Sequence, residues 1–350
     1  MTPPAPLTVG VLYPGEMGAA LAAALVARGV PVVTTARTRS AATAARGAAG
    51  GAVVLDSFDE VVRSSDVLFS LVIPSAAEDV AAQYAESARL APRGAIYVDA
   101  NSIGSERVRA IAARVEAAGV SFVDASINGL AKNLSASGTL YLSGRRAGEV
   151  AAVCERVTRV KVLGDEPGRA SAMKMLLGGL SKGVCALFAE LAALADEQGM
   201  LDAMLEATGR TYPGVTALAE RMLPTYARHA GRRATEMDEL EATARAAGLT
   251  PRAIEGVVKF HEALAEAMPA VDVEDGPPSP GTPGVGRGEG SSLRSEIRDP
   301  KPAIAKTVTA TLSRSTGRGG NASQPEVDCV PALAATVRLL TEHLTERETV

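Results

Sequence analysis

A lysine at position 174 is the residue in this sequence best suited to move a proton. It lies early in a strongly apolar stretch, Arg169 to Gln198, whose composition predicts a long helix that is buried on most sides. Burying an ammonium group costs several kcal/mol unless the group is paired or neutralised, so a lysine in this setting is a candidate general acid or base. A lysine that extends to the surface or pairs with a carboxylate fits the position too, and helix position alone favours that simpler interpretation.

Three further residues share a helix face with Lys174. Gly178, Ser181 and Lys182 follow it at spacings of four, seven and eight, which are the spacings of neighbours along one side of a helix. We therefore expect Gly178 and Ser181 to lie beside any substrate that Lys174 contacts.

A glycine-containing turn near the start of the chain is the candidate cofactor site. Leu7 to Leu12 predicts a buried strand and Met17 to Arg28 a helix, so the turn joins a strand to a helix start, whose free N–H groups and dipole favour a pyrophosphate. Because Tyr13 occupies the first glycine position of the G-x-G-x-x-G fingerprint, the match is incomplete, and an ordinary strand-to-helix turn fits as well. The expected cofactor contacts are Gly10, Tyr13, Pro14, Gly15, Glu16, Met17 and Gly18.

Two arginines follow the next predicted strand, Val30 to Thr35, which completes a βαβ unit. An NAD site usually places an Asp or Glu here for the ribose 2′-hydroxyl, and none is present. Arg37, Thr38 and Arg39 are instead suited to bind a 2′-phosphate, which favours NADP(H) over NAD(H). The alternative is that both arginines only solvate the start of the following helix.

The first half of the chain alternates between strand-like and helix-like segments, which predicts an α/β fold with a Rossmann-type doubly wound, mostly parallel sheet. Ligands of such sheets lie beyond the carboxyl ends of the strands, so Ile73, Pro74 and Asn101 are expected to line the cofactor cleft. Ordinary turn chemistry would explain these loops equally well. Beyond the two strands already given, we expect strands over 52–55, 66–73, 95–99, 120–124, 138–144 and 159–164, about eight in all, and helices over 76–90, 105–118 and 149–156.

From Gly168 the pattern becomes almost entirely helical, which predicts a second, all-α domain. Helices are expected over 169–198, 201–208, 215–229, 235–247 and 251–267. The residues expected to end them are Gly199, Gly209, Pro213, Gly231 and Gly248.

Four segments follow from these patterns. Residues 1–167 form the dinucleotide-binding domain and 168–270 the all-α domain. Residues 271–328 are rich in Pro and Gly and are expected to be disordered. Residues 329–350 predict one closing helix docked on the α domain, with an apolar face formed by Leu333, Val337, Leu340 and Leu344.

Composition narrows the possible partners. The 350 residues contain 36 Lys and Arg against 40 Asp and Glu with no long basic block, so we expect no nucleic-acid partner. The three histidines lack metal-ligand spacing, which makes a metal site improbable. The three cysteines form no disulfide pattern, which indicates a reducing cytoplasm. We see no signal peptide and no uninterrupted apolar run long enough to span a membrane.

Four motifs together resemble those of the β-hydroxyacid dehydrogenases and the related 6-phosphogluconate dehydrogenases and imine reductases. The glycine turn resembles the family's N-terminal signature, including its methionine. Asp124-Ala-Ser-Ile-Asn-Gly129 is similar to the substrate-loop motif, and Gly138-Thr-Leu is similar to the segment that follows it. Gly168-Arg-Ala-Ser-Ala-Met-Lys174 resembles the catalytic-lysine segment. Their order and spacing agree over about residues 7 to 268, which implies this fold and NADP(H) binding.

The resemblance also implies an activity. Lys174 would be the general acid/base while a hydride passes between a small hydroxy or oxo acid and the nicotinamide. Asn101, Ser102, Asn128 and Gly129 would lie near that substrate, with Ile73 and Pro74 along the cofactor. The helices after Gly199 look like the family's C-terminal domain, which commonly pairs two subunits, so a homodimer through the α domain is implied.

Several positions depart from the family pattern. The family usually has Asn where this chain has Leu177, and a second glycine where it has Leu130. The acid of 6-phosphogluconate dehydrogenases is replaced by Ser181, which argues against decarboxylation of that sugar acid. Lys174-Met175 and Ser181-Lys182-Gly183 look closer to a branch of the family whose substrate is unknown.

Two other functions stay open. An imine reductase shares the fold but commonly has another residue in place of Lys174. A cofactor-binding regulatory protein without turnover is the second alternative, suggested by Tyr13, Leu130 and Leu177. Arg232 and Arg233, with the acidic residues between Glu236 and Glu239, could reach the substrate site, or simply solvate a helix start.

Overall fold

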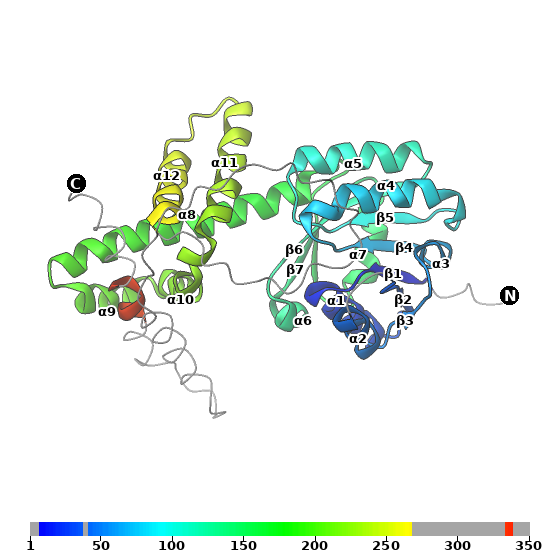
Figure 1. Ribbon diagram of the computed structural model, residues 1–350, viewed down its shortest axis with the longest axis horizontal. Coiled ribbons are helices and arrows are strands. Elements are labelled where there is room, and N and C mark those ends of the chain that lie inside the picture. Colours follow the sequence, from blue (N-terminus) through cyan, green and yellow to red (C-terminus); the bar gives the residue numbers. More distant parts are fainter. Residues whose placement is uncertain (1–6, 38–40, 268–332, 339–350) are drawn as a thin grey trace, which may run out of the picture. The chain divides into compact units, whose positions relative to one another are not determined.

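A computed structural model describes residues 7–37, 41–267 and 333–338 of the chain (Figure 1). The described residues form two compact units, which divide between Gly178 and Gly179. That division falls inside one long helix, α8 (Arg169–Glu197), whereas the sequence pattern places the boundary at 167/168, where the last strand and its loop end. The segment expected to be disordered, 271–328, lies outside the described residues.

The first unit is built on a sheet of eight strands in the order β3-β2-β1-β4-β5-β6-β7-β8. Every neighbouring pair is parallel except β6 and β7, which are antiparallel. The predicted Rossmann-type, mostly parallel sheet is confirmed. The strands are β1 (Val9–Leu12), β2 (Val32–Thr34), β3 (Val53–Val54), β4 (Val67–Ser70), β5 (Ile96–Asp99), β6 (Ser121–Asn128), β7 (Thr139–Ser143) and β8 (Arg159–Val162).

Helices cover both faces of this sheet, and each face has its own apolar core (Figure 1). On one face, α1 (Glu16–Val26) and α7 (Ala147–Cys154) pack against alternate strand residues such as Val9 and Val11. On the other face lie α3 (Phe58–Ser64), α4 (Ala77–Ser87) and α5 (Ser105–Ala117). Burial on both faces explains why these strands are continuous apolar runs in the sequence.

The sequence interpretation gave no bounds for α2 (Ala41–Ala49), which it expected only as the helix after the two arginines, and it missed α3 and α6 (Leu134–Ser137). A signal for α3 was present, because the Ser57 side chain accepts a hydrogen bond from the Glu60 N–H and caps the helix. Strand β6 is also longer than predicted. Its last residues, expected as a loop, pair with β7 from Asp124 opposite Ser143 to Asn128 opposite Thr139.

The second unit is helical. Besides its part of α8 it contains α9 (Leu201–Thr211), α10 (Pro213–Met222), α11 (Ala230–Ala246) and α12 (Arg252–Ala267). Gly199 and Gly248 have φ angles of 68° and 79° and follow α8 and α11, as predicted. Gly209 and Gly231 lie inside α9 and α11, so the breaks predicted there are wrong. A glycine costs a helix about 1 kcal/mol relative to alanine, which packing of the other helix residues overcomes.

A segment far along the chain completes the core of this unit. Residues 333–338 are helical, and Leu333 and Val337 are buried with Phe188, Leu205 and Leu264. Residues 340 and 344 of the predicted closing helix lie outside the described residues.

Helix α8 is, among the described residues, the one helix long and apolar enough to cross a membrane. Its 29 residues include a window with a mean hydropathy of 1.5, but Lys174, Lys182 and Glu190 interrupt the helix, so α8 contains no uninterrupted apolar run of that length. Cys185, Phe188 and Ala192 on this helix are buried in the core of the second unit. These residues show that α8 contributes apolar side chains to the core of the second unit.

Candidate functional site

The glycine turn between β1 and α1 is open to a ligand. Gly15 is the residue that precedes α1, and a Cβ at this position would meet nothing within 4 Å. No side chain caps this helix start, so its first N–H groups are directed outward with the positive end of the helix dipole. Exposed Glu16 and half-buried Met17 form the first turn of the helix, and Pro14 is buried. This arrangement fits the pyrophosphate of a dinucleotide.

Tyr13 has a φ of 48°, the left-handed conformation that the first glycine of the fingerprint normally supplies. A non-glycine residue held there costs about 1–3 kcal/mol and persists only where its surroundings impose it. The Tyr13 ring lies 6.5 Å from the ring of Phe58, centroid to centroid. The turn thus keeps the backbone geometry of the fingerprint although one of its glycines is absent.

Two other glycines of the motif have packing roles. Gly10 lies in the middle of β1, and a Cβ there would collide with the side chains of Ser65 and Leu68. The expectation that Gly10 contacts the cofactor is therefore corrected: close packing against neighbouring elements requires it. Gly18 is buried in α1, where a Cβ would touch Val11 at 3.4 Å, so this glycine brings the helix close to the strand.

A pocket of about 250 Å³ lies beside the turn, at the end of β2. Arg37 lies on its rim, where the Arg37 guanidinium donates to the Asp56 carbonyl at 3.3 Å. Thr38 and Arg39, the other predicted phosphate ligands, lie outside the described residues. The pocket is lined by Tyr13, Thr35, Arg37, Ser57, Phe58, Asp59 and Gln83.

The loops after β4 and β5 differ in what they present to a ligand. Ile73 is 67% exposed and Pro74 begins a short 3-10 helix, so both are accessible for a cofactor. Asn101 is only 2% exposed. Its Oδ1 accepts from the Val72 N–H at 2.7 Å and its Nδ2 donates to Ser70 Oγ at 3.2 Å. The expected cofactor contact of the Asn101 side chain is thus corrected to a structural role: it ties the two strand ends together.

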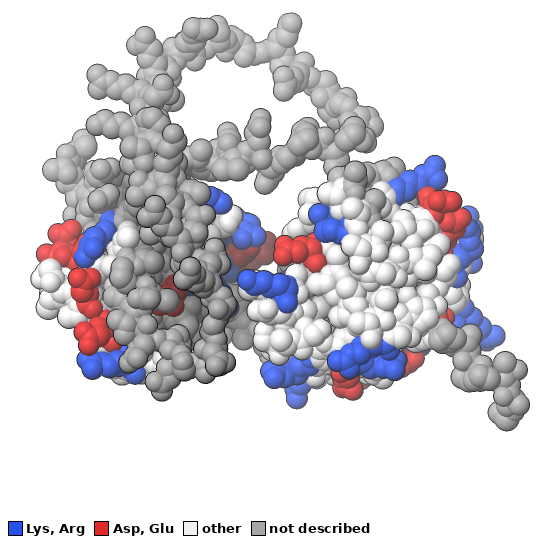
Figure 2. Space-filling model, turned by 90° about the horizontal axis from the view of Figure 1, so that it is seen from below, with Lys and Arg blue, Asp and Glu red and all other residues white. Residues whose placement is uncertain are grey.

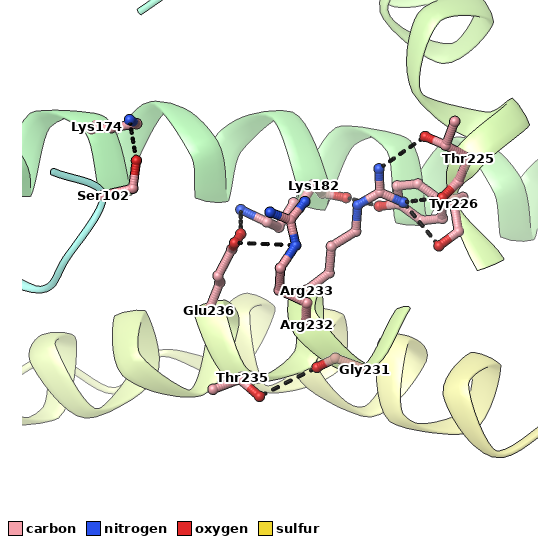
Figure 3. Close-up of polar contacts among 10 residues, drawn as sticks. All are labelled: Ser102, Lys174, Lys182, Thr225, Tyr226, Gly231, Arg232, Arg233, Thr235 and Glu236. Atoms are coloured by element: carbon pink, nitrogen blue, oxygen red, sulfur yellow. Dashed lines mark hydrogen bonds and ion pairs between the residues drawn. The ribbon is translucent and has the colours of Figure 1, made fainter. Parts of the chain in front are cut away.

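The structure brings Lys174 and Ser102 into contact. Lys174 Nζ donates a hydrogen bond of 2.6 Å to Ser102 Oγ, across 72 positions of sequence (Figure 3). Lys174 is half-buried near the start of α8, and Ser102 is exposed just past the end of β5. The Lys174 amine and the Ser102 hydroxyl are therefore placed together at the edge where ligands of parallel sheets bind.

The start of α8 is held by a carboxylate from the sheet. Asp124 is fully buried in β6, and its Oδ2 accepts from the N–H groups of Gly168, Ala170 and Ser171 at 2.9, 2.9 and 3.1 Å. Its Oδ1 accepts from Ser171 Oγ at 2.7 Å, and Ser143 Oγ donates to Oδ2 at 3.0 Å. Asp124 acts as a long-range N-terminal cap that fixes the helix carrying Lys174.

The sequence did not predict that Asp124 caps α8, because the motif from Asp124 to Gly129 is similar to a substrate loop. A signal existed in the sequence: α8 has no acidic residue in its first turn, so a cap had to come from elsewhere.

A second buried carboxylate, Asp99, lies at the end of β5. Its Oδ1 accepts from the Asn101 N–H at 3.0 Å, while its Oδ2 is buried without a hydrogen-bond partner among the described residues. Burial raises the pKa of Asp99 to about 6, against the lowering effect of its hydrogen bonds with Asn101. This group was not singled out in the sequence.

The predicted substrate loop lies at the exposed end of β6. Gly129 has a φ of 136°, and a Cβ there would come within 3.1 Å of Gly138 Cα, so this position requires glycine. Asn128 is exposed at the last position of β6. Both residues are exposed, and their contact with a substrate stays a prediction.

Further along α8, Gly178 is the last residue of the first unit, and Ser181 and Lys182 belong to the second. All three are partly buried. Lys182 Nζ lies 2.8 Å from Glu236 Oε2, and its side chain is only 12% exposed (Figure 3). Arg232 Nε lies 3.8 Å from the same carboxylate. Glu236 thus neutralises the nearly buried Lys182. The sequence had suggested that Glu236 either reaches the substrate site or solvates the start of a helix.

Surface charge on the face drawn in Figure 2 is mixed. Positive and negative side chains of the described residues are interspersed there around a broad uncharged area. This face shows no extended stripe of one sign.

The fold and the glycine turn define an NAD(P)-binding Rossmann protein, and comparison with known proteins agrees. Residues 8–158 match the family model of the NAD binding domain of 6-phosphogluconate dehydrogenase. Residues 195–264 match a domain of unknown function, DUF1932. An uncharacterised 28.5 kDa protein of Methanothermus fervidus is 27% identical over 158 residues, a match that spans 45% of this chain and 59% of that protein.

Two solved structures match about three quarters of this chain. The conserved protein MTH1747, described as structurally similar to 3-hydroxyacid dehydrogenases, is 33% identical, with a TM-score of 0.61 and coverage of 74% of this chain and 97% of that one. A Mycobacterium tuberculosis 3-hydroxyisobutyrate dehydrogenase, solved with L-serine, is 19% identical and shows the fold, with a TM-score of 0.61 and coverage of 75% and 95%. The chain belongs to the β-hydroxyacid dehydrogenase-like superfamily.

Proposed function

We propose that this protein is an NADP(H)-dependent oxidoreductase that moves a hydride between the nicotinamide and a small hydroxy or oxo acid, with Lys174 as general acid/base. The observation that carries the proposal is the hydrogen bond of 2.6 Å from Lys174 Nζ to Ser102 Oγ. It places a proton donor beside a hydroxyl at the carboxyl edge of the sheet, where a substrate hydroxyl or carbonyl would lie.

The chain's own groups supply position and a proton path. A bound nicotinamide would supply the hydride donor or acceptor. In oxidation, neutral Lys174 takes the proton from the substrate hydroxyl, and in reduction its ammonium returns a proton to the carbonyl oxygen. Ser102 orients the Lys174 amine through their hydrogen bond. Asp124 keeps the start of α8 in place, so this orientation is built in before substrate arrives.

Several features support NADP(H) as the cofactor. The open turn at Gly15 fits the pyrophosphate, and the pocket with Arg37 and Thr35 lies where the adenosine end of the cofactor would reach. Thr35 and Ala36 follow β2 in place of an acid. Asp59 also lines the pocket, but its Oδ1 accepts from Ser87 Oγ at 2.6 Å. A guanidinium on the rim favours a 2′-phosphate.

The exposed leucines of α8 support self-association. Leu180, Leu187 and Leu194 are exposed at intervals of seven residues, with exposed Leu191 beside them, so they form one apolar stripe along the second unit's part of the helix. Paired helices bury stripes with this spacing. We therefore propose that a second copy of the chain packs on this stripe to form the homodimer.

The cysteines support a cytoplasmic location. Cys154 and Cys185 are buried free thiols, and burial raises the pKa values to about 12 and about 11. Such thiols are inert structural residues and are typical of proteins in a reducing compartment.

A substrate screen tests the proposed activity. Purified full-length protein is incubated with NADPH or NADP⁺ and panels of hydroxy acids, oxo acids and imines, and cofactor absorbance is followed. Turnover of a hydroxy or oxo acid supports the proposal. Turnover of imines alone would assign the chain to imine reduction, and cofactor binding without turnover of any panel would assign it to a binding role.

A further inference from the structure

Two buried carboxylates lie side by side beneath the Lys174–Ser102 pair. Asp99 at the end of β5 and Asp124 in β6 are opposite each other in the parallel register of the two strands. Each holds a different half of the pair. Asp124 holds the start of α8, which carries Lys174, and Asp99 holds the turn that carries Ser102.

The connection from Asp99 to Ser102 is short. Asp99 Oδ1 accepts from the N–H of Asn101, the residue directly before Ser102. The Asn101 side chain then bridges to β4 and its loop through Val72 N–H and Ser70 Oγ. The position of Ser102 therefore depends on a turn whose central hydrogen bond ends on the Asp99 carboxylate.

The groups around Asp99 stabilise its ionised form only weakly. Asp124 faces it from β6 with a like charge, and Tyr97 lies two residues earlier in the same strand. Tyr84 faces Tyr97 from α4, with ring centroids 4.7 Å apart. Arg107 of α5 is the cation that acts on Asp99, but its guanidinium is bound to exposed Glu78 at 2.8 Å. Asp99 is 1% exposed and its Oδ2 has no partner among the described residues, so protonation removes a poorly solvated charge.

We propose that Asp99 is a proton-sensitive positioning residue: its charged form holds the Asn101 turn and thereby Ser102 against Lys174, and its protonated form releases that turn. The proposal rests on the proposed dehydrogenase function for its effect on turnover, but not for the structural change itself. A carboxylate is a stronger hydrogen-bond acceptor than a carboxylic acid, so the Asn101 N–H bond weakens on protonation. Since burial raises the pKa of Asp99 to about 6, the change falls within the near-neutral range.

The first test is independent of activity. Backbone ¹⁵N and ¹H shifts of Asn101 and Ser102 are followed by NMR in the cofactor-free protein between about pH 5 and 8. Both amides should titrate together with a midpoint near that of Asp99, and the titration should vanish in Asp99→Asn, which keeps an acceptor oxygen but does not ionise. Amides in the unmutated protein that do not titrate in this range would overturn the proposal without reference to any variant.

The second test uses turnover with the substrate found in the screen. In the unmutated enzyme kcat for reduction should fall about tenfold per pH unit below the Asp99 midpoint, because in this direction Lys174 acts as an ammonium, which low pH preserves, and the Asp99 ionisation alone controls the limb. In Asp99→Asn this acid limb should be lost, with less than about twofold change over the same range. Asp66→Asn is the matched control, since Asp66 accepts from the Thr8 N–H at 2.8 Å at the other end of the sheet, and it should keep the limb.

If kcat of Asp99→Asn still falls at low pH as in the unmutated enzyme, Asp99 does not control turnover. If the Asn101 and Ser102 amides titrate but the protein turns over no substrate, the pH-dependent change of the turn is supported and the proposed dehydrogenase function is overturned.

Discussion

Asp124 and Ser171 make two hydrogen bonds with each other, although 47 positions separate them. The N–H of Ser171 donates to Asp124 Oδ2, and its hydroxyl donates to Oδ1. Together with the bonds from Gly168 and Ala170, this contact fastens the start of α8 to the middle of the sheet. It explains how a helix that continues into a second unit can hold Lys174 at a defined position over the sheet's carboxyl edge.

Replacing Asp124 should therefore lower the stability of the folded protein. Asp124→Ala leaves the N–H groups of Gly168 and Ser171 and two serine hydroxyls without this acceptor, while the Ala170 N–H keeps its 3.1 Å bond to Ser143 Oγ. We expect a loss of about 3–5 kcal/mol in the free energy of unfolding. Urea unfolding followed by circular dichroism measures this. Asp165→Ala, at an exposed position shortly before α8, should change stability by less than about 0.5 kcal/mol. Equal stability of the two variants would show that the cap is not needed.

Lys174→Ala should abolish turnover and leave cofactor binding intact. General acid/base groups contribute about 10²–10⁴-fold to rate, so kcat should fall by at least about 100-fold. The NADPH dissociation constant, measured by cofactor fluorescence, should change less than about twofold because the proposed role of Lys174 is in proton transfer and not in holding the pyrophosphate. The exposed lysine in β8 provides the control variant Lys161→Ala. Wild-type kcat in Lys174→Ala would rule out the proton role.

Arg37→Ala should weaken NADPH binding and spare NADH binding. Charge-assisted hydrogen bonds contribute about 1.5–3 kcal/mol, so the dissociation constant for NADPH should rise by about 10–100-fold. Titration of both cofactors with the wild-type protein, Arg37→Ala and the exposed control Arg63→Ala measures the difference. If both cofactors weaken equally in Arg37→Ala, the arginine does not select a 2′-phosphate.

Asp99→Asn should stabilise the protein at neutral pH. Burial raises the pKa of folded Asp99 from 3.8 to about 6, so the native state favours the protonated form more than the unfolded state does. The contribution of protonated Asp99 to the free energy of unfolding is therefore complete below its pKa in the unfolded state, and it is lost as the pH rises through its pKa in the folded state. The variant should gain up to roughly 2–3 kcal/mol near pH 7 and little near pH 3.5. Urea unfolding at both pH values tests this, and a gain of the same size at both would contradict it.

Leu187→Glu should convert a dimer into monomers. The leucine is exposed in the centre of the α8 stripe, and a charge buried in a helix pair would destabilise it strongly. Sedimentation velocity measures the mass of the wild-type protein, of Leu187→Glu and of Leu249→Glu, which replaces an exposed leucine after α11. A monomeric wild-type protein, or a Leu187→Glu dimer, would exclude this surface.

Much of the architecture was readable in the sequence because its signals are local. All eight strands were predicted. Most of them are continuous apolar runs buried on both faces, whereas β3 and β8 at the sheet edges are largely exposed. The glycine turn and the apolar helix with Lys174 were also found from local signals. Helix ends were less readable. Gly199 and Gly248 adopt positive φ and end their helices, whereas Gly209 and Gly231 do not, since tertiary packing can override a weak propensity.

The sequence by itself determined the alternation of elements, the turn for a dinucleotide and the position of Lys174 early in a buried helix. Only the tertiary structure decided what these residues contact. Gly10 and Asn101 look like ligand residues by motif but are occupied by packing and hydrogen bonds inside the sheet unit. Asp99 and Asp124 become neighbours through strand register, and Ser102 meets Lys174 across 72 positions. Periodicity reports one element at a time, whereas such contacts exist only after distant elements have been placed against each other.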